Sequence, residues 1–91
     1  MSLTYEVRLT PPAVRALHRL PAKVADAVLR FLDGPLSENP YRVTKPLGRE
    51  LADLRSGYVG LSFRVLVSIR DDEGIVYAQR ISHRADAYRP L

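Results

Sequence analysis

The chain opens with a short alternating pattern. Residues 5–9 alternate apolar and polar side chains, which is the period of a strand with one face buried. We expect a strand here whose core-facing side chains are Tyr5, Val7 and Leu9. The polar positions between them then face away from the core.

Helical periodicity replaces alternation after this strand. Thr10 followed by Pro11 is typical of a helix N-terminus, and Val14 and Leu17 lie on one face of the helix that this start predicts.

This first helix should break at Leu20-Pro21, where a second helix begins. Its apolar side chains recur at the i, i+4, i+7 and i+8 positions, namely Val24, Val28, Phe31 and Leu32. Asp33-Gly34-Pro35 should end it, with Gly34 in a left-handed conformation. Because almost no loop separates the two helices, a helical hairpin is expected.

The second half of the chain predicts strands. Residues 37–48 contain two prolines and are expected to form a connecting loop. Strands are expected over residues 54–58, 61–70 and 75–82. Asp71-Asp72-Glu73-Gly74 is an acidic turn that lacks the spacing of metal ligands and is typical of a solvated hairpin tip. The predicted fold is therefore a single α+β domain over residues 1–91, in which a small antiparallel-rich sheet packs against the helical hairpin.

Turn lengths predict the register of this sheet. A two-residue turn at Val59-Gly60 would place Arg55 opposite Arg64, and a three-residue turn at residues 72–74, with Gly74 left-handed, would pair Arg64 with Ser82 and Leu66 with Arg80. The side chains expected to face the helices are Leu61, Phe63, Val65, Val67 and Ile69. The side chains expected on the other face are Arg55, Ser62, Arg64, Ser68, Arg70 and Arg80. Like charges placed opposite one another destabilise a sheet, so this face either binds an anion or is an ordinary solvated surface.

Composition narrows the classes of partner. The 91 residues carry a net charge of +4, which favours a polyanion. Among the 14 basic residues only Lys23 and Lys45 are lysines, a bias that suits phosphate recognition but that a GC-rich genome would also produce. No cysteine is present, no apolar run approaches the ~18 residues of a membrane span, and the N-terminus does not resemble a signal peptide. These features favour a cytoplasmic protein.

The order of these elements and motifs resembles the RelE/ParE superfamily of bacterial toxins. The resemblance covers residues 5–89 and rests on Lys45-Pro46-Leu47, Leu54-Arg55, Phe63-Arg64-Val65, His83-Arg84 and Tyr88. It implies a RelE-like enzyme that cuts messenger RNA in the ribosomal decoding site with basic residues and a tyrosine, and with neither a metal nor a cofactor. It also implies a RelB-like antitoxin that covers the basic face, and an antitoxin-mediated complex with operator DNA. A ParE-like inhibitor of DNA gyrase and a catalytically weak homologue acting as co-repressor are the alternatives.

By motif position, the resemblance implies catalytic roles for Arg64, Arg84 and Tyr88, and for Arg55 where the family often has a lysine or arginine. The chain departs from the family pattern at Gly57, Ser62, Phe63 and Val67.

The chemistry expected of such an enzyme is attack by a ribose 2′-hydroxyl on the adjacent phosphate, which leaves a 2′,3′-cyclic phosphate. Arginine stabilises the phosphate charge but cannot act as a base, so either Tyr88 or His83 moves the protons. The residues expected to bind the RNA backbone are Arg42, Lys45, Arg49, Arg70 and Arg80.

Overall fold

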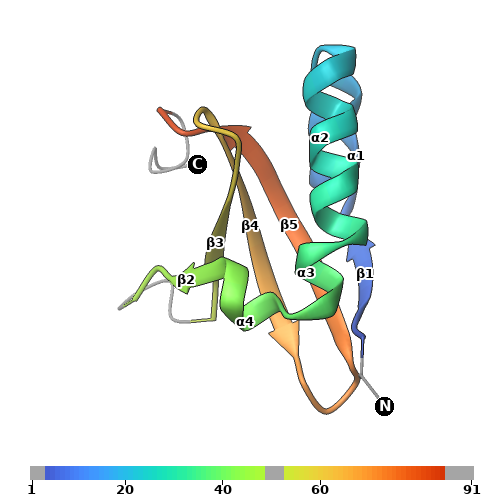
Figure 1. Ribbon diagram of the computed structural model, residues 1–91, viewed down its shortest axis with the longest axis vertical. Coiled ribbons are helices and arrows are strands. Elements are labelled where there is room, and N and C mark those ends of the chain that lie inside the picture. Colours follow the sequence, from blue (N-terminus) through green and yellow to red (C-terminus); the bar gives the residue numbers. More distant parts are fainter. Residues whose placement is uncertain (1–3, 49–52, 86–91) are drawn as a thin grey trace.

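The computed structural model describes residues 4–48 and 53–85, which form a five-stranded sheet with two helices on one face (Figure 1). The strands lie in the order β1-β5-β4-β3-β2. β1 runs parallel to β5, and the other neighbouring pairs are antiparallel. The elements are β1 (Glu6–Leu9), α1 (Pro11–Arg19), α2 (Ala22–Asp33), α3 (Pro35–Glu38), α4 (Pro40–Val43), β2 (Thr44–Pro46), β3 (Arg55–Val59), β4 (Phe63–Arg70) and β5 (Ile75–His83). The α+β prediction is therefore confirmed.

The helical hairpin forms as the sequence predicts. The Thr10 hydroxyl accepts a hydrogen bond from the Ala13 N–H at 3.4 Å, and proline occupies the first turn of α1. In α2, Val28 and Leu32 are buried and Val24 and Phe31 pack against the core, as the helical period predicts. No helix in the part of the chain that the structure describes is long and apolar enough to cross a membrane.

Two details of the hairpin differ from the prediction. The buried position of α1 is Ala13, whereas Val14 is 37% exposed. Gly34 ends α2 with a φ of −108°, so it is not left-handed. The reason is that α3 begins at Pro35, directly after Gly34, so Gly34 is also the N-cap of a right-handed helix.

The segment expected to be a loop is ordered into three short elements. α3 and α4 have four residues each, and β2 pairs with β3 as an edge strand. Pro35 and Pro40 each occupy the first turn of a helix, and the Asn39 side chain accepts a hydrogen bond from the Arg42 N–H at the start of α4. These prolines start helices instead of excluding them.

The core lies between the sheet and the two long helices. Val65, Val67, Val76 and Ala78 are fully buried there, and Phe63 and Ile69 pack against them, which confirms the predicted inward face of β4. Leu61 was expected on this face but is 87% exposed. It lies in the turn between β3 and β4, outside both strands.

The β3–β4 register differs from the prediction by three residues, because Arg55 lies opposite Val67 and not opposite Arg64. Val59 pairs with Phe63 across a three-residue loop in which Gly60 has a φ of +62°, so Tyr58, and not Arg55, lies opposite Arg64. This register places Val59 in the core and leaves Tyr58 on the other face. The hydrophobic pattern thus selects it, because a slip of one residue would exchange the two side chains.

The β4–β5 register contains two compensating features. The connecting turn has four residues rather than three, with Arg70 opposite Ile75, and Gly74 is left-handed at a φ of +68°. A β-bulge then leaves Gln79 as the extra residue of β5, between the partners of Leu66 and Val67. Arg64 therefore pairs with Ser82 and Leu66 with Arg80, as predicted, although the turn prediction was one residue short.

The acidic hairpin tip is tied to the rest of the fold by two tyrosines. The Tyr5 hydroxyl donates to Asp71 Oδ1 at 2.6 Å, and the Tyr41 hydroxyl donates to Oδ2 of the same carboxylate. These hydrogen bonds hold the pKa of Asp71 below its usual value, and the bond to Asp71 raises the pKa of Tyr5 to about 12. Asp71 therefore joins the β4–β5 hairpin to the start of β1 and to α4.

The lowered pKa of Asp71 predicts a pH-dependent contribution to stability. Because the folded state favours the ionised carboxylate, its contribution is present above the unfolded-state pKa of about 4 and is lost as the pH falls through the lower folded value. We expect Asp71→Asn to lower the thermal unfolding temperature at neutral pH, with the difference shrinking below about pH 4. Asp72→Asn, at an exposed position on the same tip, is the matched control. A deficit that stays constant down to pH 2 would contradict this role of the carboxylate charge.

Candidate functional site

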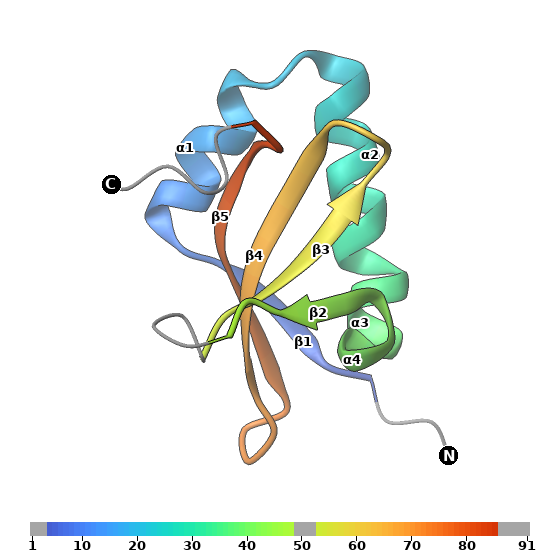
Figure 2. The same ribbon diagram turned by 90° about the vertical axis from the view of Figure 1, so that its left-hand side faces the viewer.

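The sheet face that α1 and α2 leave uncovered carries most of the predicted binding residues. We call it the open face; Figure 2 views it from the side opposite these helices. Strand alternation and the pairing register place on it Glu6, Arg8, Lys45, Ser56, Tyr58, Arg64, Leu66, Ser68, Arg70, Tyr77, Arg80 and Ser82. Five of these side chains are basic and one is acidic. The face therefore has the positive charge that an anionic ligand requires.

Arg64 lies on the central strand β4, one residue from the strand end next to the β3–β4 turn, and is only 9% exposed. Its guanidinium carbon lies 4.6 Å from the ring centroid of Tyr58, and its Nη2 donates a hydrogen bond to the Tyr58 hydroxyl. On the other neighbouring strand it lies opposite Ser82. A guanidinium fixed in this way loses little freedom on meeting a phosphate, and partial burial strengthens the electrostatic attraction.

Three serines on the open face have buried hydroxyls. Ser82 lies opposite Arg64, Ser56 lies opposite Leu66, and Ser68 lies four residues further along β4 than Arg64. Ser68 Oγ accepts a hydrogen bond from Gln79 Nε2 at 2.9 Å. The hydroxyls of Ser56 and Ser82 have no hydrogen-bond partner within residues 4–48 and 53–85, which is uncommon for buried polar atoms.

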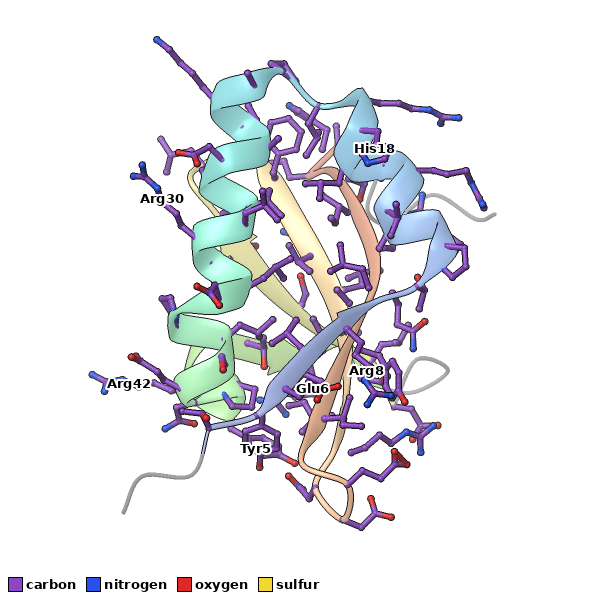
Figure 3. The ribbon with its side chains drawn as sticks, turned by 90° about the vertical axis from the view of Figure 1, so that its right-hand side faces the viewer. Tyr5, Glu6, Arg8, His18, Arg30 and Arg42 are labelled. Carbon is purple, nitrogen blue, oxygen red and sulfur yellow. The ribbon has the colours of Figure 1, made fainter. Side chains whose placement is uncertain are left out.

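Arg8 was not predicted as a site residue. It neighbours Tyr77 across the β1–β5 pair and forms an ion pair with Glu6, and both labelled side chains lie beside β1 in Figure 3. The hydrogen bond to Glu6 is the main cause that raises the pKa of Arg8. The signal was present in the sequence, because Arg8 alternates with the inward-facing Val7 and Leu9.

Arg55 lies on the opposite side of the sheet from Arg64, which corrects the prediction that the two face one another. It pairs with Val67, a core residue, and its guanidinium is used by neighbouring backbone and side-chain groups. Arg55 Nε donates to the Thr44 hydroxyl at 2.8 Å and Nη2 to the Thr44 carbonyl at 2.9 Å, while the guanidinium carbon lies 5.0 Å from the ring centroid of Tyr41. Arg55 therefore anchors α4 and β2 to β3.

Gly57 also faces the helices, which accounts for one departure from the family pattern. A Cβ atom at this position would lie 2.8 Å from Phe31 Cζ and 3.2 Å from Thr44 Cγ2. A larger side chain would have to displace the helix α2 contact, so glycine is the residue that this register requires.

His83 is not brought together with Arg64. It pairs with Phe63, and the two rings meet edge to face at 5.5 Å on the side of the sheet that faces the helices. His83 Nδ1 accepts a hydrogen bond from the Ala85 N–H at 3.2 Å. The imidazole therefore packs at the strand end, with one nitrogen engaged in the turn.

Arg84 follows β5 directly and is exposed. Its backbone N–H donates to the Ser62 carbonyl at 2.6 Å, which holds the end of β5 against the β3–β4 turn. Its position beyond the end of β5 places it at the same end of the sheet as that turn. Tyr88 and Arg49 lie outside the described residues.

The predicted RNA-binding residues divide between two surfaces. Lys45, Arg70 and Arg80 lie on the open face by register, Arg80 directly across from Leu66. Arg42 is exposed on α4 and projects outward from it (Figure 3). The open face therefore joins Lys45, Arg70 and Arg80 to Arg64, and Arg42 extends the basic surface to its flank.

A hollow between β1 and α2 lies elsewhere. Its apolar lining includes Tyr5, Val7, Leu9, Leu29 and Leu32. None of the candidate catalytic or RNA-binding residues contributes to it, so it is separate from the basic site.

Comparison with known proteins now identifies the class. The chain is 46% identical over 87 residues to Toxin RelG of Mycobacterium tuberculosis, a match that covers 96% of this chain and 99% of the relative. It is 41% identical over 85 residues to Toxin RelE of the same organism, covering 93% of this chain and 87% of the relative. The chain therefore belongs to the RelE-like toxin superfamily, as its motifs predict. No family model matches it.

The fold agrees with this assignment. The toxin–antitoxin complex RelBE2 from Mycobacterium tuberculosis contains a chain that superposes with a TM-score of 0.86 at 44% sequence identity, covering 94% of this chain and 98% of that one. The sheet and helical hairpin are thus those of a RelE-like toxin.

Proposed function

We propose that this protein is the toxin of a toxin–antitoxin system and acts as an mRNA endoribonuclease on the ribosome. The observation that carries the proposal is Arg64, which is nearly buried and held by Tyr58 on the central strand of a basic sheet face. Such a guanidinium suits a phosphate that gains negative charge in the transition state. The similarity to Toxin RelE and Toxin RelG supports the same class of activity.

The reaction that fits these residues is intramolecular. The ribose 2′-hydroxyl attacks the adjacent phosphorus, the bond to the 5′-oxygen breaks, and the products carry a 2′,3′-cyclic phosphate and a free 5′-hydroxyl. Arg64 and Arg84 stabilise the charged phosphate, and Tyr88 moves a proton. Because DNA lacks the 2′-hydroxyl, the substrate is RNA.

Lys45, Arg70, Arg80 and Arg8 hold the RNA backbone on the open face, with Arg42 as a flanking contact. Arg49, which lies outside the described residues, is a further candidate for this role. Each phosphate neutralised by one of these side chains makes binding more sensitive to salt, whatever the base sequence. The ribosome supplies the message in the decoding site.

The partner that silences this activity is a RelB-like antitoxin. Two observations support this partner. The matched RelBE2 chain lies in a toxin–antitoxin complex, and the positive charge of the open face suits an acidic segment of an antitoxin. In this arrangement the antitoxin also carries the complex to operator DNA.

The class of activity is tested by inducing the toxin without an antitoxin. We expect translation to stop while messages cut within their coding regions accumulate on ribosomes, and we expect the new 3′ ends to carry a 2′,3′-cyclic phosphate. Co-expression of the protein encoded beside the toxin should restore growth. Gyrase-linked DNA breaks with intact messages would instead indicate a ParE-like activity, and neither effect would indicate a non-catalytic binding protein.

A further inference from the structure

We infer that Tyr58 is a stacking platform for a nucleobase, and that it acts together with Arg64 as a nucleotide-binding pair. The inference rests on the proposed function for the class of ligand, a single-stranded RNA. It adds a residue that neither the family motifs nor the predicted site includes.

The geometry of Tyr58 leaves room for a base. One side of its ring is engaged by the Arg64 guanidinium at 4.6 Å, and its hydroxyl accepts a hydrogen bond from Arg64 Nη2. The residue nevertheless remains 52% exposed, although it projects from a strand in the middle of a sheet face. A large aromatic side chain held rigidly and left half exposed loses little entropy when a flat ligand packs on it.

The surroundings favour a nucleotide over a purely apolar ligand. Lys45 lies on the same face of the neighbouring strand β2, and Ser82 lies opposite Arg64 on β5. Aromatic rings interleaved with basic side chains are the combination that binds single-stranded nucleic acid, because every base offers a π-face and every nucleotide a phosphate. In this arrangement the base stacks on the exposed part of the Tyr58 ring and the adjacent phosphate meets Arg64.

A second arginine–tyrosine pair within the described residues provides a matched control. Tyr41 is 45% exposed and lies 5.0 Å from the Arg55 guanidinium, so its exposure and its cation–π contact are similar. However, its hydroxyl donates to Asp71 and its arginine is bonded to Thr44, on the helix side of the sheet. The two tyrosines are therefore similar in exposure and in their contact with an arginine, and they differ in the face they occupy and in the partner of the hydroxyl.

The chain contains no tryptophan, so a single Tyr58→Trp substitution creates a unique fluorescent reporter. The probe is a hexanucleotide of 2′-O-methyl RNA, which cannot be cleaved, titrated into the purified full-length toxin at low salt. A second hexanucleotide with the same backbone but without bases separates stacking from phosphate binding, and a terminal dye on each strand reports binding independently. Tyr41→Trp is the control protein.

We expect the base-containing strand to quench the Tyr58→Trp emission and the abasic strand to leave it nearly unchanged, while Tyr41→Trp responds to neither. Tyr58→Leu, which keeps an apolar side chain but removes the π-face, should weaken binding of the base-containing strand by about 5- to 150-fold. Tyr58→Phe should retain most of that affinity. Equal quenching by both strands, no quenching at saturation, or no binding would overturn the inference.

The result is separable from the proposed function. Stacking on residue 58 concerns binding of the isolated strand, whereas the proposed function is measured by cleavage of messages on ribosomes. A protein that shows base-dependent quenching but cuts no message would support the stacking role of Tyr58 and contradict the proposed endoribonuclease activity. A protein that cuts messages without quenching would support the endoribonuclease activity and contradict the stacking role of Tyr58. Thermal unfolding of each variant identifies a loss that comes from misfolding.

Discussion

Replacing Arg64 with alanine is expected to lower the rate of message cleavage by about 10²–10³-fold, the range observed when one donor to a charged transition state is removed. The physical reason is that Arg64 is only 9% exposed and is held by Tyr58, so in the proposed site its charge would meet the phosphate with little reorganisation. The measurement is the rate of cleavage of a ribosome-bound message by purified protein, together with growth arrest on induction. Arg64→Lys should restore only part of the activity, because an ammonium lacks the planar fork of donors.

Arg55→Ala is the matched control, because it removes the same side chain from the other side of the sheet. Its hydrogen bonds to the Thr44 hydroxyl and carbonyl anchor β2 and α4, so we expect a loss of about 1–3 kcal/mol in unfolding free energy. Cleavage by the folded fraction should fall far less than for Arg64→Ala. A folded Arg64→Ala protein that cuts at the parent rate would show that Arg64 is not part of the site. An Arg55→Ala protein that is stable but inactive would instead support the catalytic role that the sequence predicts for Arg55.

The strands and the long helices could be predicted from the sequence because many residues in each element repeat the same apolar spacing. β4 has an apolar, core-facing residue at every second position from Phe63 to Ile69, and α2 carries four apolar residues at helical spacing, so a local error does not change either element. α3 and α4 contain one turn each, which is too short for any period to appear. Their prolines were interpreted as breaks, although a proline in the first turn is equally compatible with a helix start.

Register was harder to predict because it depends on turn length, where one residue changes the face of every side chain. The β4–β5 pairs at Arg64 and Leu66 were predicted correctly only because the bulge at Gln79 offsets the longer turn. No such compensation occurs between β3 and β4. The consequence for the site is direct: Arg55 moves to the helix side and Tyr58 takes its place beside Arg64.

The candidate site was predicted in part. Arg64, Arg80, Arg70 and Lys45 share the open face because alternation along β4 and pairing with its neighbours bring them there. His83 does not join them, since adjacent residues of a strand such as Ser82 and His83 point to opposite faces. Because His83 is next to Arg84 and close to Tyr88 in the sequence, it was predicted to lie with them, although the strand directs its side chain to the other face.

The assignment of the proton carrier gives the other large expected effect. Tyr88→Phe removes only the phenolic hydroxyl, so we expect cleavage to fall by about 10²–10⁴-fold, the usual contribution of general acid–base catalysis, while ribosome binding changes little. The motif position of Tyr88 after Arg84 supports this role, and Tyr88 itself lies outside the residues that the structure describes. Tyr58→Phe, which removes a hydroxyl bonded to Arg64, is the matched comparison and should have a smaller effect on the cleavage rate.

His83→Ala should also have a small effect, because His83 packs on Phe63 and faces away from Arg64. The two variants together separate the candidates. Rates are measured on ribosome-bound message, with ribosome binding measured separately for each variant. A Tyr88→Phe protein that cuts at the parent rate, combined with loss of cleavage in folded His83→Ala protein, would transfer the proton-carrying role to His83 and require its ring to turn toward the open face during the reaction.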